Sequence, residues 1–380
     1  MVMFRKAAGN IFLLGYFAAI ILFLAASFTT YVNPAHWWHV GFIGLLFPYL
    51  LLVLVVFTVF CVFVRIRFTI FGLIALAISY KNISAVIALR PSAEFAVSKN
   101  PEHLRVMTWN VRRFTPFYSD FFDPKDNNLS AIVEEVRRFD PDIICFQEFY
   151  TSIKKSRNLD LFQEMGYEYY AFALLKTPGS TSNSGTIIFS KYPILQSYFF
   201  DLPQKLSTNA EDPVAADIVV GRDTVSVGTF HMQSYGFLHH DYEDMARIKN
   251  QADTGLKASR NIFRKMRYAF TLRGLQADII NEKMSASRYP VILCGDLNDV
   301  PSSYSYVTIR GDRKDAFLEK GSGLGKTFVS GRSRFLTWLP TLRIDYIFID
   351  PGIEVVQFRP VTRQLSDHLG LITDVELPKK

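Results

Sequence analysis

The chain has 380 residues, 49% of them hydrophobic, and a formal net charge of +7 that is unevenly distributed. Residues 1–90 contain no Asp or Glu but hold six basic residues. Removing those six from the 42 Lys and Arg residues leaves 36 basic against 35 acidic side chains over residues 91–380. The basic character therefore belongs to an apolar N-terminal stretch, and residues 91–380 lack the electrostatic footprint of a nucleic-acid-binding domain.

Two long uncharged segments, 10–32 and 41–64, dominate the N-terminal stretch. Each exceeds the length needed to cross a hydrocarbon core of about 30 Å at about 1.5 Å per residue, so both predict transmembrane helices. A cleaved signal peptide is the alternative for the first, but its apolar run is too long and a second span follows at once. Trp37 and Trp38 lie between the two segments, where amphipathic rings settle at a membrane interface.

The segment 68–89 is a third apolar stretch, although its first uncharged run is only 13 residues long and ends at Lys81. We expect it to cross as well, with Lys81 near an interface. The alternative is a helix lying on the membrane surface. Basic residues flank the first two spans on one side, which the positive-inside rule makes cytoplasmic: Arg5, Lys6, Arg65 and Arg67. Three crossings place residues 91–380 on the extracytoplasmic side, whereas a surface helix would leave them in the cytoplasm.

Residues 91–102 form a predicted linker, and residues 103–380 form a domain in which short apolar strands alternate with polar and helical stretches. Helices are predicted at 127–139 and across most of 241–284. Strands are predicted at 104–111, 142–149, 185–194, 214–220, 223–232, 289–297, 343–350, 353–358 and 369–377. Many strands with few helices indicate an α+β fold in which two packed sheets are flanked by helices.

Polar residues capable of chemistry recur where these strands begin or end. In the stretch GDLNDVPSS, Asp296 and Asn298 follow a strand that is predicted to be buried, and residues two apart on a strand point to the same side. Taken singly, an Asn or Asp at a strand end usually caps a turn. The complete set is Asn110, Glu148, His231, Asp296, Asn298, Asp345, Asp367 and His368.

The order of the motifs around these residues is more specific than any one of them. TWNV, CFQE, GTFHMQS, GDLND, RIDYIF and SDHLG follow one another between residues 104 and 377. In this respect the chain resembles the endonuclease/exonuclease/phosphatase superfamily, and GDLND together with SDH is the most specific part of the match. The resemblance implies a four-layer α/β/β/α sandwich of the deoxyribonuclease I-like type, preceded here by the transmembrane helical region.

The resemblance also implies a metal site. Glu148 would be the principal Mg²⁺ ligand with help from Asn110, and Asp367 would complete the environment of the metal or of the neighbouring histidine. Oxygen ligands suit a hard cation that keeps several waters, with Mn²⁺ as a substitute for Mg²⁺.

The remaining residues would act on the substrate. His368 would stand at the scissile phosphate as a general base or as a cation, and Asp345 would orient its ring. Asp296 would position or deprotonate the attacking water. Asn298 and His231 would bind the phosphate, His231 from the other side. Such a set matches in-line attack on a phosphate, which needs its charge neutralised and a water aligned opposite the leaving oxygen.

One segment departs from the superfamily pattern. After GTFHMQS the chain carries an unusually basic stretch with interleaved apolar and aromatic residues: Lys257, Arg260, Ile262, Phe263, Arg264, Lys265, Met266, Arg267 and Tyr268. It is either a solvated helix face or a basic amphipathic segment at the membrane surface or over an anionic substrate.

Together these features predict an integral, multi-pass membrane protein whose domain hydrolyses phosphoester bonds with Mg²⁺. The expected partners are the lipid bilayer and a phosphoester substrate, namely a lipid head group, an inositol phosphate or nucleic acid, with no protein partner predicted. A nuclease is the alternative within the same chemistry, although the near-neutral domain favours it less. The alternative from another class is an inactive membrane scaffold or binding module.

Overall fold

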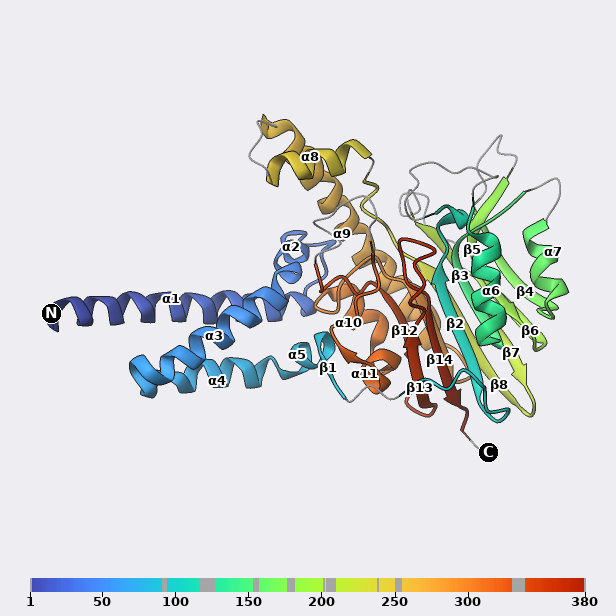
Figure 1. Cartoon of the computed structure of the whole chain (residues 1–380), viewed down its shortest axis with the longest axis horizontal. Coiled ribbons are helices and arrows are strands. Elements are labelled where there is room, and N and C mark those ends of the chain that lie inside the picture. The colour runs from blue at the N-terminus through green and yellow to red at the C-terminus, as the bar shows by residue number, and fades with distance from the viewer. Residues whose placement is uncertain are drawn as a thin grey trace.

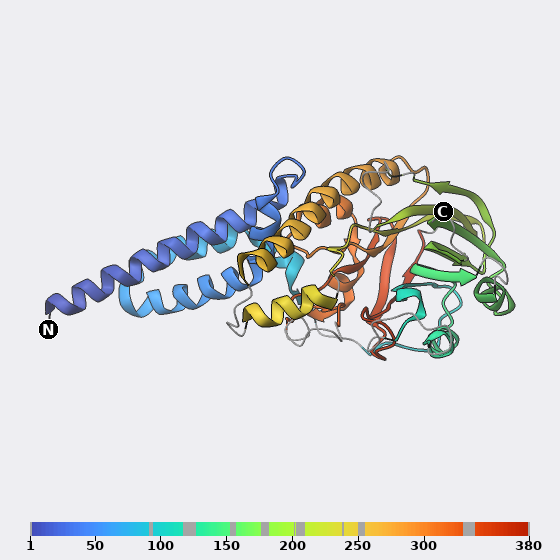
Figure 2. The same ribbon diagram turned by 90° about the horizontal axis from the view of Figure 1, so that it is seen from above.

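The computed structural model describes residues 2–90, 94–116, 127–152, 157–175, 182–200, 202, 210–237, 239–249, 255–329 and 339–378. A narrow group of N-terminal helices stands on one side of a broad β-sandwich (Figures 1 and 2). Within the predicted basic segment, the side chain of Lys257 lies outside the described part.

The N-terminal region is mostly helical. Two helical stretches, Ala7–Tyr31 and Phe47–Ile78, are long and apolar enough to cross a membrane by length and composition. The second is interrupted at Arg65, whose φ of −155° and ψ of 71° break the helix, and the chain then runs back beside itself (Figure 1). The helices are α1 (Val2–Phe28), α2 (His39–Leu45), α3 (Phe47–Arg65), α4 (Thr69–Ile78) and α5 (Tyr80–Val86). The predicted third segment, 68–89, is thus two short helices that meet at Ser79.

Close packing joins α1, α3 and α4. The backbone N–H of Gly72 donates to the Tyr16 hydroxyl at 2.8 Å. A Cβ atom at Gly72 would lie 2.2 Å from that hydroxyl and 2.3 Å from Thr58 Oγ1, so the three helices approach each other where only glycine fits. The side chains on the outside are apolar and strongly exposed, for example Leu14 at 74% and Phe63 at 82%. A group of helices that is apolar on the outside is typical of a membrane environment.

Two six-stranded sheets form the rest of the molecule. The first has the order β10-β12-β9-β8-β7-β6 and the second the order β13-β14-β2-β3-β5-β4. A two-stranded ribbon pairs β1 (Ala88–Leu89) with β11 (Ser322–Gly323). The strands of the first sheet are β6 (Ile194–Phe199), β7 (Glu211–Val220), β8 (Asp223–His231), β9 (Val291–Asp296), β10 (Lys314–Asp315) and β12 (Asp345–Ile349). Those of the second are β2 (Leu104–Asn110), β3 (Ile143–Ser152), β4 (Tyr169–Leu175), β5 (Ser182–Ser190), β13 (Glu354–Pro360) and β14 (Leu371–Glu376).

Three apolar cores hold four layers together. Inward residues of both sheets, such as Val227 and Ile188, form the central core between the sheets. Helix residues cover the outer face of each sheet, as Ile132 does on the second and Ile280 on the first. The helices are α6 (Leu129–Phe139), α7 (Arg157–Glu164), α8 (His239–Lys249), α9 (Gly255–Ser285), α10 (Tyr304–Arg310) and α11 (Ala316–Lys320). The predicted α/β/β/α sandwich is confirmed.

Strand direction brings the predicted site residues to one end of the sandwich. β2 is parallel to β3, and β8 is parallel to β9. Within β8 and β9, His231 stands beside Asp296. β12 is antiparallel to β9, so its first residue, Asp345, also stands beside Asp296. Because β14 is likewise antiparallel to β2, the residues just before β14 reach the same end as Asn110.

Some elements differ from the sequence-based prediction. The predicted strand 185–194 ends at Ser190, and β6 begins at Ile194 after a turn, because Ser190 and Tyr192 hydrogen-bond across that turn. The prediction that most of 241–284 is helical is confirmed by α8 and α9, with residues 250–254 outside the described part of the chain. The prediction omitted β4, nearly all of β6 and the short helices α7, α10 and α11.

The helical region is packed into the sandwich domain. Ser302 donates its hydroxyl to the Gly44 carbonyl at 2.9 Å, so the GDLNDVPSS stretch touches α2. Phe42 contacts Phe270 of α9 with ring centroids 5.0 Å apart. Ala85 belongs to the apolar core under α9 and α10, which makes α5 part of the domain's own packing.

Candidate active site

A buried histidine–aspartate pair lies at the centre of the site. Nδ1 of His368 is 3.0 Å from both carboxylate oxygens of Asp345, and both residues are at most 5% exposed. Because Asp345 holds Nδ1, the other ring nitrogen, Nε2, is left for a second partner. Nε2 lies 3.6 Å from Asp296 Oδ2. The segment just before Phe328 holds Asp345 in place, because Thr327 Oγ1 accepts the backbone N–H of Asp345 at 3.1 Å.

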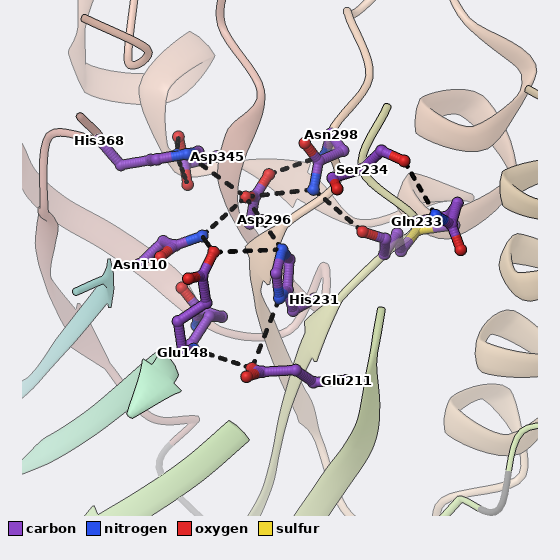
Figure 3. Close-up of polar contacts among 12 residues, drawn as sticks. Asn110, Glu148, Glu211, His231, Gln233, Ser234, Asp296, Asn298, Asp345 and His368 are labelled. Carbon is purple, nitrogen blue, oxygen red and sulfur yellow. Dashed lines mark hydrogen bonds and ion pairs between the residues drawn. The ribbon is translucent and has the colours of Figure 1, made fainter. Parts of the chain in front are cut away.

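Asp296 lies between the two sheets and is fully buried. Its Oδ2 accepts from Asn110 Nδ2 at 3.0 Å, and its Oδ1 accepts the backbone N–H of Asn298 at 2.8 Å (Figure 3). Asn298 adopts φ = 52°, a left-handed conformation that turns its side chain back to Asp296 and to the Met232 carbonyl at 2.9 Å. Gly295 has to be glycine, since a Cβ there would lie 2.1 Å from the Phe230 carbonyl oxygen.

Glu148 is aimed by a bulge in β3. The register between β3 and β5 shifts between Phe146 and Phe149, and Glu148 has φ = 52°. A bulge redirects a side chain that regular pleating would send elsewhere, and backbone strain of this kind concentrates at functional sites. Its Oε1 accepts from Asn110 Nδ2 at 3.2 Å, while its backbone N–H donates to Glu211 Oε2 at 2.8 Å.

His231 faces three carboxylates. Its Nδ1 is 3.5 Å from Glu211 Oε2, and its Nε2 is 3.7 Å from Asp296 Oδ2 and 3.9 Å from Glu148 Oε1 (Figure 3). Asp367 is more peripheral, with a side chain 23% exposed that pairs with Arg112 Nε at 3.5 Å. The eight predicted residues thus converge on one end of the sandwich, with Asp367 at the edge.

Comparison with models of protein families identifies the family to which this chain belongs. The sequence model described as the endonuclease/exonuclease/phosphatase family matches residues 107–368, a span that contains all eight residues. The chain belongs to this family. A second model, described as a domain of unknown function, matches residues 9–86. No curated protein matches the chain.

Solved structures of the family share the fold at low sequence identity. An endonuclease/exonuclease/phosphatase from Beutenbergia cavernae is 23% identical, covers 73% of this chain and 72% of its own, and superposes with a TM-score of 0.52. The human Nocturnin catalytic domain is 16% identical over 73% of this chain and 96% of its own, with a TM-score of 0.48. A family protein from Leptotrichia buccalis is 14% identical over 72% and 100%, with a TM-score of 0.49.

Burial and charge set the protonation of the site. Burial raises the pKa of Asp296; the charge of His368 opposes this and that of Asp345 adds to it, which brings the pKa to about 6. Burial alone would lower the pKa of His231, but Glu211, Asp296 and Glu148 together raise it to about 9. Burial likewise opposes charge on His368, yet Asp345 and Asp296 raise its pKa well above 6.5. Both rings therefore favour the cationic form at neutral pH.

The donor set fits a divalent cation. Members of this family typically use one, and Asp296, Asp345 and His368 place one ligand atom each within 4.8 Å of one another. In that group, Nδ1 of His368 is already hydrogen-bonded to Asp345. Glu148 offers a carboxylate next to the Asn110 amide, whose Nδ2 donates to Glu148 and whose Oδ1 accepts from the Arg112 N–H at 3.0 Å, and His231 Nε2 lies 3.9 Å from Glu148 Oε1. Several carboxylates lie together in this buried site, and they raise the pKa of the two histidines beside them. This indicates a concentration of negative charge, which a bound cation would neutralise.

Sequence reasoning missed two residues that hold this site. Glu211, 4% exposed, links Glu148 to His231; the only signal for it was an acidic residue at the start of the apolar run VAADIVV. Arg273 on α9 is fully buried, donates to the Asn298 carbonyl and lies 3.6 Å from Asp299 Oδ2. Nothing in the sequence separates Arg273 from the exposed arginines that precede it on the same helix.

Proposed function

We propose that this chain is a membrane-anchored, Mg²⁺-dependent hydrolase of phosphoester bonds with its catalytic domain on the extracytoplasmic side. The observation that carries the proposal is the His368–Asp345 pair, held 3.6 Å from Asp296 at the end where both sheets open. Members of the family are metal-dependent phosphodiesterases, and this pair supplies a positive charge beside a buried carboxylate.

Glu148 and Asn110 are the proposed holders of the metal ion. Glu148 is 29% exposed at its side chain, which leaves a face open to an incoming cation. Asp367 lies further out, and its charge supports the cationic form of His368. A bound Mg²⁺ supplies positive charge to the phosphate and orients it.

Asp296 is proposed to position or deprotonate the attacking water. With a pKa of about 6 it is mostly ionised at neutral pH and basic enough to accept a proton, and Asn110 and Asn298 hold both of its oxygens in place. Asn298 and His231 flank it, and His231 in its cationic form would bind a phosphate oxygen.

His368 is the proposed group on the phosphate. Asp345 fixes Nδ1, so the N–H on Nε2 of the charged ring is directed to the open side next to Asp296. In that place it stabilises charge developing on phosphoryl oxygens, and it can pass a proton to or from the reacting atoms.

A membrane-associated phosphoester is the proposed substrate class. Two of the apolar stretches qualify as membrane spans by length and composition, and the chain reversal at Arg65 returns α4 along α3. An odd number of passes would place the domain opposite the N-terminus and confine its site to the bilayer surface. Residues 91–380 have 36 basic and 35 acidic side chains, which offers little to a long phosphate backbone.

Turnover by the purified full chain tests the proposal. Hydrolysis of bis(p-nitrophenyl) phosphate is expected with Mg²⁺ and lost with EDTA, and His368→Ala should abolish it while His103→Ala, outside the site, should not. A screen of phospholipid, inositol phosphate and DNA would then rank the substrates. Absence of metal-dependent turnover on all of them would support the inactive scaffold instead, and preference for DNA would support the nuclease.

A further inference from the structure

The exposed face of α9 carries a stripe of basic and aromatic side chains. Arg260, Phe263, Arg264 and Arg267 are exposed, Phe263 at 44%, and they recur at the spacing of three to four residues that lines one face of a helix. α9 contains no Asp or Glu between Gly255 and Ala277. We call these four residues the α9 stripe.

The nearby acidic residues do not neutralise this face. Asp241 of α8 is fully buried and engaged by Lys265 at 2.5 Å, on a different side of α9. Glu243 and Asp244 lie further along α8. Within the described part of the chain, Arg260, Arg264 and Arg267 form no ion pair with a carboxylate; Arg264 donates to Asn261 at 2.9 Å, and Arg267 stands over Trp38.

The stripe lies where the apolar helices end. Phe263 contacts Phe42 and Trp38 of the connection between α1 and α3, with ring centroids 4.6 Å and 5.1 Å apart. The Arg267 guanidinium is 4.9 Å from the Trp38 ring. In both ribbon views α9 runs from the sandwich to the side of the helical group, with α8 next to its first turns (Figures 1 and 2).

The same connection marks a change in surface chemistry. Large apolar side chains are exposed up to this level, including Phe28 at 60%, Tyr31 at 65% and Leu46 at 53%, and Trp37 is exposed at 61%. Beyond it the α9 stripe begins. An apolar belt, then tryptophans, then arginines is the order in which hydrocarbon, interface and headgroups succeed each other in a bilayer.

We propose that the α9 stripe binds the headgroups of an anionic phospholipid bilayer. The proposal rests on the membrane anchoring proposed above and adds the lipid class that the surface recognises. Its chemistry is charge-assisted hydrogen bonding from guanidinium groups to lipid phosphates, while Phe263 and the tryptophans sit at the interface. Each Arg near an anionic bilayer raises the binding constant for that bilayer by about fivefold. Three arginines therefore give a preference for an anionic over a neutral bilayer on the order of 100-fold.

Cysteine accessibility in nanodiscs measures the contact directly. The three native cysteines, Cys61, Cys145 and Cys294, are buried, so a neutral polyethylene glycol maleimide will report on an introduced one. Ser259→Cys places it next to the stripe at an exposed position. Gln196→Cys, exposed on the distant strand β6, is the matched control.

The full chain would be compared in discs of phosphatidylcholine alone and of phosphatidylcholine with phosphatidylglycerol. We expect labelling of Ser259→Cys to be at least about tenfold slower in the anionic discs, with labelling of Gln196→Cys unchanged. Added salt should restore the rate, and the triple variant Arg260→Gln, Arg264→Gln, Arg267→Gln should remove the difference.

Equal labelling of Ser259→Cys in both kinds of disc would overturn the proposal, as would a difference that persists in the triple variant. Equal protection by soluble glycerophosphate in neutral discs would also overturn it, because the stripe would then bind small anions rather than a surface. Failure of the anchoring itself is distinguishable: the chain would leave membranes in alkaline carbonate and would not enter the discs.

Discussion

Replacing Asp345 by Asn tests the central pair of the site without changing its shape. The carboxylate has both oxygens 3.0 Å from Nδ1 of His368 and is 3% exposed, so water cannot take over its role. A hydrogen bond to a charged group contributes about 1.5–3 kcal/mol, and one between neutral groups about 0.5–1.5 kcal/mol. If only the charge is removed, the difference between these two contributions corresponds to a rate about tenfold lower.

The amide adds a second effect. Asn can also donate to Nδ1, which stabilises the ring tautomer without a proton on that nitrogen, and a misplaced proton removes general acid–base help worth roughly 10²–10⁴ in rate. We therefore expect Asp345→Asn to lower kcat between about 10-fold and 10³-fold with a smaller change in KM, because the lost interaction grows as charge develops.

The pH profile and a double-mutant cycle provide the assay. Asp345 raises the pKa of His368, so Asp345→Asn must lower it, and activity that needs the cationic ring should be lost at a lower pH than in the parent. His368→Ala combined with Asp345→Asn should be little slower than His368→Ala alone. Strictly additive losses, or an unshifted alkaline limb, would refute the reasoning and leave Asp345 as a structural residue of β12.

Three further outcomes are expected. Glu148→Gln should abolish Mg²⁺-dependent turnover while circular dichroism stays unchanged, and near-normal activity at saturating Mg²⁺ would contradict the metal assignment. The pKa of His231 is about 9 in the folded chain against about 6.5 in the unfolded chain. In EDTA this shift should contribute roughly 3 kcal/mol to the free energy of unfolding below pH 6.5, and that contribution should be lost as the pH rises through 9. Urea unfolding of the parent and of Glu211→Gln across this range checks it, since the variant should show a flatter dependence. A topology reporter fused after Lys380 should behave as exported, and cytoplasmic labelling would mean that 68–89 does not cross.

Much of the fold could be predicted because local signals and tertiary structure agree. The apolar run of β9 and the mostly apolar sequences of β2 and β14 are bounded by polar residues, and Asn110, Asp296 and His368, at or next to the ends of these strands, lie in the site. Helices cover the outer face of each sheet, so both faces of these strands are buried, and short apolar runs bounded by turn residues were the signal rather than strict alternation.

The remainder depends on contacts that sequence alone does not encode locally. Glu148 reaches the site through a bulge whose register shift is visible only in the pairing with β5. Glu211 acquires its role from its contact with Glu148, which lies 63 residues away in the sequence. Arg273 differs from Arg264 only in which side of α9 it occupies, and burial of one guanidinium rather than another is decided by the packing of Tyr235 and Asn298 against it.

The buried contacts between the N-terminal helices and the family domain have a consequence for producing the domain alone. Arg343, 1% exposed, donates to the Ala85 carbonyl at 2.5 Å, and Ser302 donates to Gly44, although the two family models divide the chain at 86 and 107. A gene fragment starting after residue 90 would leave the buried Arg343 guanidinium with Asp315 but without the Ala85 carbonyl, and would leave the Ser302 hydroxyl without the Gly44 carbonyl. The N-terminal helices thus contribute to the packing of the family domain, and we expect the domain to be less stable when it is produced without them.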